Sequence, residues 1–438
     1  MNLGEFVRKQ HEAGNLVVQP RMGLSDPAQM RAGLIATRMA DASTVGTVTL
    51  DSYTRLGQLE SVGQAVRQGL PLNGYPIVSY AEATTREMLD GVVAPDFPVQ
   101  VRHGSARPMD IFRAITGVRL HATEGGPISY CLPYGRTPLD ESVRNWAICC
   151  ELVLKTREFG VEPHLETFGG CMLGQLCPPS QLVAISVIEA LFFYRRGLRS
   201  LSVSYAQQTN AEQDREAVAA LRRLCAELLP GADLHVVIYA YMGLFPETPE
   251  GARGVLADAA RLAVNTGSER LIVKTVAEAH RIPTVAENVA ALEHAAAVAR
   301  ATSAPVLLGA DGGQTYLEAY ALVDAVLNCD PDLGNAIVAA FKRGLLDVPY
   351  CLHPDNAGRA RSYIDAEGKL RWAETGSLPL SLSDVTDRRG RRSLTSANLL
   401  DALSYVRNRF DAIALERGRA FVLDAAEAVA AAGEGELD

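Results

Sequence analysis

The chain has 438 residues, of which 48% are hydrophobic and 21% are charged, and its formal net charge at pH 7 is −9. This composition supplies a sizeable buried core, and the acidic balance argues against duplex nucleic acid as a partner, because phosphate binding needs clustered Lys and Arg. No apolar run approaches the roughly 18 residues of a membrane span, and the first residues lack the apolar core of a secretory signal, so the sequence predicts a cytoplasmic protein.

Short runs rich in β-branched residues recur along the chain, and each is followed by a segment with helical periodicity. That alternation predicts an α/β fold with a parallel sheet. The runs are NLVVQPR (15–21), STVGTVTLDS (43–52), PIVSY (76–80), PVQVRHG (98–104), VRLHATE (118–124), PHLETFG (163–169), SLSVSYA (200–206), DLHVVIYAY (233–241) and RLIVKT (270–275). Nine candidates for eight places predict a closed (β/α)8 TIM-type barrel in which one of the runs is not a strand.

The connecting segments have apolar residues at helical spacing, as in GARGVLADAARLAV (251–264) and ALVDAVLN (321–328), and fit an outer ring of helices. From residue 345 the pattern changes, because SYIDAEGKLRWAE (362–374) is typical of a hairpin around a glycine turn and an Ala-rich helix follows. We therefore predict a barrel domain over residues 1–344 and a smaller α+β extension over residues 345–438.

The eight cysteines and eight histidines are scattered along the chain, without a CxxC pair or the spacing of zinc ligands. We expect reduced, mostly buried thiols and no protein-bound metal. The glycine-rich VLLGADGGQT (306–315) fits an ordinary turn better than a phosphate cradle.

Charged side chains gather where the predicted strands end, which is where barrels of this kind carry out their chemistry. These residues are Arg21, Arg55, Arg102, Glu124 and Lys274. Because Arg presents a planar fork that matches a carboxylate, three arginines and one glutamate fit a small dicarboxylate that also has an ammonium group.

Other interpretations of the same residues stay open. Each arginine taken alone also fits a structural ion pair at the rim of the barrel. Lys274 at a strand end could form a Schiff base, as in an unrelated TIM-barrel lyase or aldolase. Tyr130 and Tyr134 could simply pack in the core, although Pro133 disfavours the continuous helix that would stack them.

Several motifs resemble, in order and spacing, the large catalytic subunit of adenosylcobalamin-dependent glutamate mutase, also called methylaspartate mutase. They are QPRMG (19–23), TLDSYTR (49–55), PLNGYP (71–76), VQVRHG (99–104), ATEGGPISYCLPY (122–134), MGLFP (242–246), IVKTVAEAHRIPT (272–284), LLDVPY (345–350) and NAG (356–358). The resemblance extends from about residue 15 to about residue 385. It implies a TIM barrel with the substrate inside its mouth and a cobalamin above it.

The resemblance also implies roles for matching residues of this chain. The substrate-binding residues would be Arg21, Arg55, Arg102, His103, Glu124, Tyr130 and Tyr134. The cofactor-binding residues would be Gly23, Asn73, Pro133, Phe245, Lys274, Glu278 and Ile282. In this assignment the arginines clamp the two substrate carboxylates, while Glu124 holds the ammonium and is catalytic if it accepts part of its proton.

The implied isomerase reaction is the reversible rearrangement of L-glutamate to (2S,3S)-3-methylaspartate, with adenosylcobalamin as cofactor. The cofactor supplies the radical chemistry, and the protein supplies position and electrostatics. The segment DLHVVI (233–238) begins like the DxHxxG signature that presents a histidine to cobalt, but Ile238 replaces the glycine and His235 lies in a predicted strand. A separate small cobalamin-binding subunit with the true motif is therefore implied, in a heterotetramer built around a homodimer of large subunits.

One departure from the family concerns IYAY (238–241), where Tyr239 and Ala240 replace a His-Gln pair that is common in the family. This change alters one wall of the expected pocket. Two alternatives therefore stay open: a mutase of the same mechanism that acts on another amino dicarboxylate, and a degenerate subunit that binds without turnover.

Overall fold

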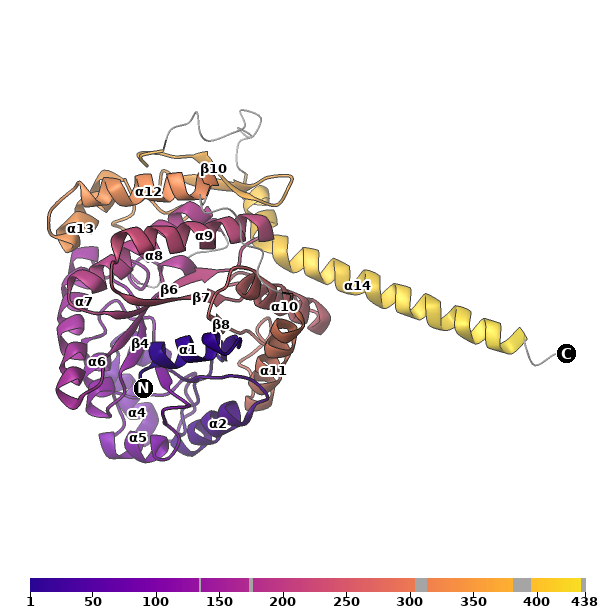
Figure 1. Cartoon of the computed structure of the whole chain (residues 1–438), viewed down its shortest axis with the longest axis horizontal. Helices are drawn as coiled ribbons and strands as arrows, with labels where there is room; N and C mark the ends of the chain where they lie inside the picture. The colour runs from indigo at the N-terminus through magenta and orange to yellow at the C-terminus, as the bar shows by residue number, and fades with distance from the viewer. Residues whose placement is uncertain (134, 173–175, 304–312, 381–394, 435–438) are drawn as a thin grey trace.

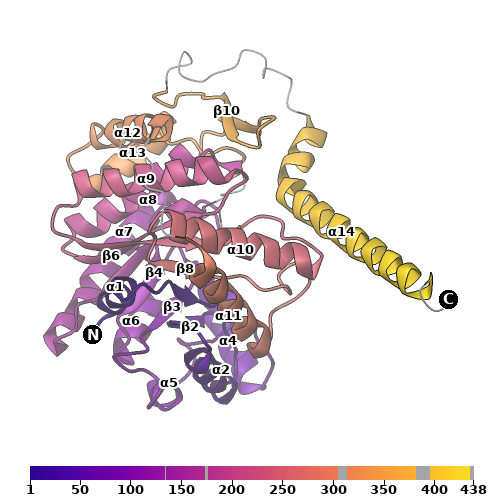
Figure 2. The same ribbon diagram turned by 45° about the vertical axis from the view of Figure 1, so that its right-hand side comes forward.

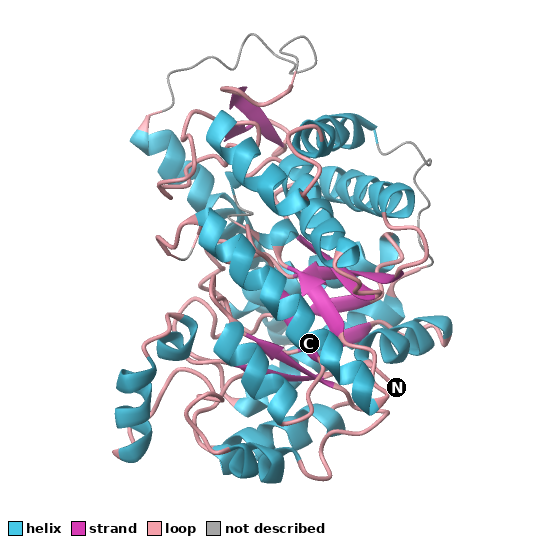
Figure 3. Cartoon of the chain, turned by 90° about the vertical axis from the view of Figure 1, so that its left-hand side faces the viewer, coloured by secondary structure: helices cyan, strands magenta, loops and turns pink. Residues whose placement is uncertain are grey.

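The structure is a computed structural model that describes residues 1–133, 135–172, 176–303, 313–380 and 395–434, with side chains in the last range up to residue 416. Eight parallel strands form its centre, in the order β1-β8-β7-β6-β5-β4-β3-β2. They are β1 (Val17–Gln19), β2 (Gly46–Thr49), β3 (Val99–Arg102), β4 (Ala122–Gly125), β5 (His164–Thr167), β6 (Ser200–Ala206), β7 (Asp233–Tyr239) and β8 (Arg270–Ile272). Figure 3 shows these strands in magenta, surrounded by helices. The predicted TIM-type barrel is confirmed.

The prediction of a strand at PIVSY (76–80) is wrong. Tyr75 makes one isolated bridge to Leu50, after which the N–H groups of Ser79 and Tyr80 both donate to the carbonyl of Pro76, at 2.9 and 3.2 Å. Pro76 has no N–H to offer a neighbouring strand, and its carbonyl is used within the local turn. The segment therefore turns although its composition is typical of a strand.

The two ends of the sheet, β1 and β2, are joined by isolated contacts rather than by a continuous ladder. Val18 bridges Thr44 in parallel, and its N–H donates to the carbonyl of Ser43 at 2.9 Å. Near the opposite end of β2, the N–H of Thr49 donates to the carbonyl of Met22 at 2.9 Å. The barrel is thus nearly closed, and its looser seam lies between the two strands that lead to Arg21 and Arg55.

A short helix, α1 (Leu3–Glu12), covers the amino-terminal end of the barrel. It begins with a capping box in which Asn2 and Glu5 satisfy each other's backbone N–H groups. Its apolar face forms a buried cluster with residues at the starts of the strands: Leu3, Phe6, Val7, Val17, Val45 and Ala122. This end is closed by packing, so the chemistry is left to the carboxyl ends of the strands.

The outer helices follow the predicted alternation. They are α2 (Pro27–Met39), α3 (Ser52–Arg55), α4 (Leu59–Arg67), α5 (Glu82–Leu89), α6 (Met109–Gly117), α7 (Leu139–Leu154), α8 (Pro179–Arg195), α9 (Ala211–Leu228), α10 (Pro249–Asn265), α11 (Val285–Ala301), α12 (Gly313–Leu327) and α13 (Leu333–Arg343), with 3-10 turns η1 (Lys155–Phe159) and η2 (Gly169–Cys171). Residues 179–193 of α8 are all buried, because α9 and α12 pack against it on the side away from the sheet (Figure 1). Most of VLLGADGGQT lies outside the described residues.

The C-terminal part begins with the predicted hairpin, β9 (Arg361–Ile364) and β10 (Leu370–Glu374), which pair antiparallel. Gly368 has a φ of 78° at its turn, a left-handed conformation that favours glycine. The last helix, α14 (Ser396–Glu434), projects away from the body (Figures 1 and 2). It is fastened near its start, where Asp411 accepts from the N–H of Thr248 at 2.9 Å. The division at residue 345 stays a prediction.

Two further observations concern the chain as a whole. Within the described residues, no helix combines the length and the apolar character that crossing a bilayer would require. All eight cysteines are free, seven of them are buried and Cys329 is half-buried, which agrees with the expected thiols.

Candidate functional site

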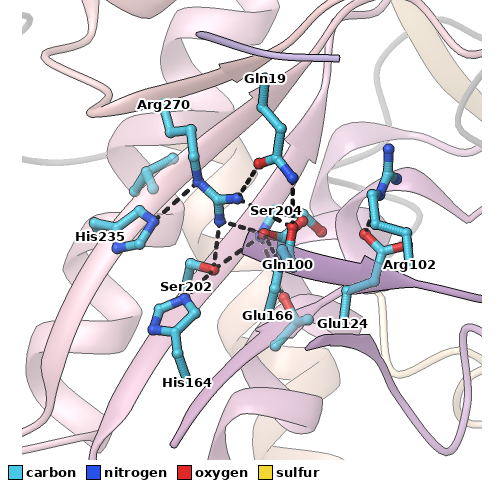
Figure 4. A network of polar contacts seen from close by, with 12 residues as sticks. Gln19, Gln100, Arg102, Glu124, His164, Glu166, Ser202, Ser204, His235 and Arg270 are labelled. Atoms are coloured by element: carbon cyan, nitrogen blue, oxygen red, sulfur yellow. Dashed lines mark hydrogen bonds and ion pairs between the residues drawn. The ribbon is translucent and has the colours of Figure 1, made fainter. Parts of the chain in front are cut away.

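Polar side chains fill the middle of the barrel, where branched apolar residues are more usual. The fully buried members of this layer are Gln19, Thr47, Gln100, Glu166, Ser202 and Arg270. Figure 4 shows that all of them except Thr47, which it does not label, point toward one another from β1, β3, β5, β6 and β8, and Thr47 on β2 accepts from Gln19 Nε2 at 2.9 Å. Because buried polar groups are costly unless they are hydrogen-bonded, such a layer persists only when its members satisfy one another.

The centre of this layer is the ion pair between Arg270 and Glu166, two side chains with no exposed surface. Arg270 also donates from Nε to Nε2 of His235 at 3.2 Å, while Gln100 Nε2 donates to Glu166 Oε2 at 3.1 Å. Burial and the charge of Arg270 lower the pKa of His235 well below its usual value, so the ring is neutral and can accept. His235 is therefore a core histidine, stacked on His164 at 5.2 Å, as the sequence predicted.

A second buried ion pair lies nearer the mouth. Arg102 at the end of β3 donates from Nε to Glu124 Oε2 on β4 at 2.7 Å, with side-chain exposures of only 5% and 2%. Burial alone would lower the pKa of Arg102, but Glu124, Tyr239 and Tyr130 together outweigh it and raise that pKa well above its usual value. Arg102 and Glu124, predicted from different motifs, are thus brought into direct contact.

Two tyrosines complete the coordination of Glu124. Tyr130 hydrogen-bonds Oε1 through its hydroxyl, and the hydroxyl of Tyr239 donates to Oε2 at 2.8 Å. The Tyr239 oxygen accepts from Arg102 Nη2 at 3.2 Å and also contacts Glu166, so the single hydroxyl hydrogen of Tyr239 is shared between the two carboxylates. Tyr239 therefore connects the ion pair at the mouth with the pair in the layer below.

Two hydrogen-bond donors beside this pair have no partner of normal geometry in the described structure. His103 Nδ1 accepts from the N–H of Ser105 at 3.1 Å, so the hydrogen of the neutral ring lies on Nε2, which is buried and unpaired. Burial, followed by the charges of Arg55 and Arg102, lowers the pKa of His103 to about 3 and keeps the ring neutral, although a contact with the Glu124 backbone opposes this shift. Nε of Arg55 is also buried without a partner. Unsatisfied buried donors at a barrel mouth fit an anionic ligand.

Arg55 owes its position to the short helix α3. Asp51 caps this helix by accepting from the N–H of Thr54 at 2.9 Å, and Asn73 Oδ1 accepts from the N–H of Ser52 at 3.0 Å. A cleft of about 700 Å³ opens beside Arg55, and Gly104, Arg107, Tyr130 and Arg136 are among its other lining residues. The site is thus open on the side where three arginines gather.

A second group of predicted residues lies at the ends of β1, β7 and β8. Glu278 is shared by Arg21 at 3.7 Å and by Lys274 at 3.8 Å, and the Lys274 ammonium lies 5.0 Å from the ring centroid of Phe245. Burial lowers the pKa of Lys274 to about 8, with Glu278 opposing that shift and Arg21 adding to it. These residues come together as expected, but Arg21 contacts Glu278 rather than the Arg102–Glu124 pair.

The remaining predicted residues are more peripheral. Gly23 lies where a Cβ would be only 2.1 Å from the carbonyl oxygen of Thr49, so packing at the barrel seam already requires glycine there. Pro133 is half-buried and Ile282 is exposed. Tyr134 lies outside the described residues.

Sequence reasoning missed Glu166, Arg270 and the depth of Tyr239. The available signal was the alternation within the strands. Gln100 and Arg102 on β3 are two positions apart, as are His164 and Glu166 on β5, so each pair faces the barrel axis. The prediction assigned these residues to strands but did not consider which of their side chains would face inward. Among the described residues, no group of three or more His, Cys, Asp or Glu is arranged to hold a metal ion.

Comparison with known proteins places this geometry in context. The sequence profile of the family described as "Methylaspartate mutase E chain" matches residues 1–398. The glutamate mutase epsilon subunit of Escherichia coli O157:H7 is 30% identical over 396 residues, which cover 86% of this chain and 81% of that protein. The glutamate mutase epsilon subunit of Halobacterium salinarum is 33% identical over 358 residues, covering 79% of this chain and 74% of that protein. Among solved structures, the YdjI aldolase from Escherichia coli K12 has a TM-score of 0.36 at 10% identity, covering 68% of this chain and 95% of that one, a likeness too low to bear on function.

Proposed function

Because the chain belongs to the methylaspartate mutase E chain family, we propose that it is the large subunit of an adenosylcobalamin-dependent mutase that interconverts L-glutamate and (2S,3S)-3-methylaspartate. The observation that carries this proposal is the buried Arg102–Glu124 pair, flanked by the unpaired donors of Arg55 and His103. A zwitterionic dicarboxylate presents the complementary charges: one ammonium for Glu124 and two carboxylates for the cationic and N–H donors.

Binding would proceed by exchange of ion pairs. The amino acid inserts between Arg102 and Glu124, so that Arg102 turns to one substrate carboxylate and Glu124 accepts the ammonium. Arg55 and the Nε2–H of His103 hold the remaining carboxylate oxygens, which satisfies both unpaired donors. The substrate thus replaces one internal ion pair by two or more intermolecular ones, which favours an amino dicarboxylate over a diacid that lacks the amine.

The chain contributes positional control and exclusion of water. Glu124 has only 2% of its surface exposed, and Tyr130, Phe168 and Tyr239 pack around it, with ring centroids 5.0 Å apart for Tyr130 and Phe168. Held ammonium and carboxylate groups keep a fragmenting substrate from drifting. Glu124 is also placed to accept part of the ammonium proton during rearrangement, since a carboxylate at this site has no competing solvent.

Residues around the second cluster fit the cofactor. When bound, adenosylcobalamin supplies a carbon radical by homolysis of its cobalt–carbon bond. Lys274 and Glu278 offer an ammonium and a carboxylate that suit ribose hydroxyls, with Phe245 beneath Lys274 and Gly23, Asn73, Pro133 and Ile282 around the mouth. Ile282, Leu56 and Leu244 are exposed in the segments that follow β8, β2 and β7, and together they would form an apolar border for a large flat ligand.

A small cobalamin-binding subunit is part of the proposal. His235 is held in the barrel by Arg270 and cannot reach a cobalt ion from there, so a ligand of the DxHxxG type must come from another chain. The apolar border around the mouth offers that subunit a contact surface. We expect a heterotetramer with two large subunits at its centre.

Proton NMR of L-glutamate, incubated anaerobically with this protein, adenosylcobalamin and the small subunit of the same organism, tests the proposal. A methyl doublet of 3-methylaspartate that requires both proteins would support it. Turnover of only another amino dicarboxylate would keep the mechanism and change the substrate. Failure of the chain and the small subunit together to bind cobalamin would favour the degenerate subunit.

One alternative enzyme class has a direct test. Burial lowers the pKa of Lys274 to about 8, a property shared by Schiff-base lysines. Its contact with Glu278 at 3.8 Å favours an ion pair instead. Borohydride would trap substrate on Lys274 in an aldolase or lyase, and the proposed mutase predicts no such adduct.

A further inference from the structure

Glu189 lies in the middle of α8, with no exposed surface. Residues 179–193 of this helix are all buried, most of them apolar, and Glu189 forms no ion pair with any described residue. A buried carboxylate is costly unless donors compensate for its lost hydration. Its donors therefore indicate what it holds in place.

Most of those donors belong to the turn that follows β4, and the backbone N–H of Phe168, just after β5, is a further one. Glu189 Oε1 accepts from the N–H groups of Ile128 at 3.1 Å and Ser129 at 2.8 Å, and Oε2 accepts from the Ser129 hydroxyl at 3.0 Å. The turn itself is a short helical segment, in which the N–H of Leu132 donates to the carbonyl of Ile128 at 3.0 Å. Glu189 thus acts from a distance as the cap of this segment, satisfying N–H groups that the turn leaves free.

The fit between Glu189 and the turn is close. A Cβ on Gly126 would lie 2.0 Å from the Glu189 carboxyl carbon, so only glycine permits the approach. Burial raises the pKa of Glu189 to about 7, while hydrogen bonds from Ser129, Ile128 and the backbone of Phe168 oppose that rise. Gly126 and the Glu189 carboxylate are therefore packed directly against each other.

The turn has one side chain that enters the candidate site. Tyr130 follows the two capped residues and hydrogen-bonds Glu124 Oε1. Its ring lies between His103 at 5.1 Å and Phe168 at 5.0 Å. A displacement of residues 128 and 129 would therefore move the tyrosine hydroxyl relative to Glu124.

We propose that Glu189 is a positioning residue of the substrate site, which holds the turn at residues 126–132 so that Tyr130 stays on Glu124. The expected effect on KM rests on the proposed function, whereas the expected effect on the position of the turn does not. Glu189 contacts neither the substrate pocket nor the cofactor rim directly, and it acts through Tyr130.

The kinetic test compares Glu189→Leu with the conservative Glu189→Gln, in which the amide oxygen can keep both backbone bonds and the NH2 group faces the Ser129 hydroxyl. Because Glu189→Leu leaves buried N–H groups of the turn unpaired, it should raise KM for L-glutamate about tenfold or more. Glu189→Gln should stay within about threefold of the wild type by the same reasoning. In the Tyr130→Phe background the effect of Glu189→Leu on KM should largely disappear.

Asp214 provides a matched control. This buried carboxylate of α9 also caps a strand-end loop, accepting from the N–H of Gln208 at 3.0 Å and from the hydroxyl of Tyr205 at 2.8 Å. It has no contact with Tyr130 or Glu124 in the described structure. Asp214→Leu should lower stability comparably and leave KM unchanged. A KM effect of Glu189→Leu that is equally large in the Tyr130→Phe background would overturn the proposal.

Hydrogen exchange of the large subunit alone tests the structural step without turnover. Glu189→Leu should speed exchange of the amides of Ile128 and Ser129, while residues 206–210 stay as in the wild type; unchanged exchange at 128–129 would refute the inference. If the wild type lacks mutase activity, the proposed function fails, and this exchange experiment still decides the role of Glu189. If Glu189→Leu does not fold, Glu189→Asp takes its place, because it withdraws the carboxylate by one methylene.

Discussion

The Nε atom of Arg102 lies 2.7 Å from Oε2 of Glu124, and this ion pair is nearly sealed from solvent. In the absence of ligand, each side chain compensates the buried charge of the other, because an unpaired buried charge is costly. The pair therefore keeps a cation and an anion together in a nearly dry pocket, and the proposed binding mode requires the substrate to exchange with it.

Glu124→Gln should separate binding of the ammonium from the rest of the site. The amide can still accept from Arg102, but it can neither neutralise an ammonium nor accept its proton, so kcat/KM for L-glutamate should fall by roughly a hundredfold or more. The matched control is Glu250→Gln, which removes a carboxylate from an exposed ion pair with Arg253. Unchanged turnover of Glu124→Gln would remove the proposed role of this carboxylate.

Tyr239→Phe and Tyr241→Phe make a second matched pair. The hydroxyl of Tyr239 hydrogen-bonds with Arg102, Glu124 and Glu166, whereas the buried hydroxyl of Tyr241 has no hydrogen-bond partner in the described structure. Loss of the first should lower the free energy of unfolding by about 1–3 kcal/mol, and loss of the second should change it by less than about 0.5 kcal/mol. Urea denaturation of both variants measures the difference, and equal effects would show that the Tyr239 contacts do not stabilise the barrel.

The sequence predicted the barrel because its strands and helices differ in period and composition. Eight of nine expected strands are present, and the exception, residues 76–80, is decided by the backbone of Pro76 rather than by side-chain type. Propensity describes a residue's fit to a pleated surface, and it does not report which carbonyl and N–H groups remain free for a neighbour.

The candidate site could be predicted only in part. Arg21, Arg55, Arg102, Glu124 and Lys274 were predicted as site residues because strand ends converge in a barrel, whereas Glu278 was predicted only from the family resemblance. The contact of Tyr239 with both carboxylates required knowledge of register, since a shift of one residue would turn it to the outer face. Glu189 gave no local signal at all, because its partners in the turn, Ser129 and Ile128, are 60 and 61 residues away in the chain.

The buried Glu166–Arg270 pair predicts non-additive mutations. Removing either charge leaves the other unpaired inside the barrel, so Glu166→Gln or Arg270→Gln alone should cost about 3–5 kcal/mol of unfolding free energy. The double variant should cost less than the sum of the two, because no uncompensated charge remains. Equilibrium denaturation of the four proteins gives the coupling energy, and strict additivity would show that the two side chains do not interact energetically.

Lys274 predicts a dependence of stability on pH. Burial lowers the pKa of its ammonium from 10.5 to about 8 in the folded chain. Between these two values the unfolded chain retains a proton that the folded chain has released, so the free energy of unfolding rises with pH in this window. Below pH 8 both states are protonated and the penalty of burying the charge is fully present, on the order of 3 kcal/mol.

Lys274→Met removes that titrating group, while Arg21 still compensates Glu278 at 3.7 Å. The variant should therefore be more stable than the wild type at pH 7, and the difference should shrink as the pH rises toward 9.5. Comparing the two proteins at each pH cancels the titration of the buried cysteines and tyrosines, which both chains share. A stability difference that stays constant from pH 7 to pH 9.5 would mean that the Lys274 pKa is not lowered in the folded chain.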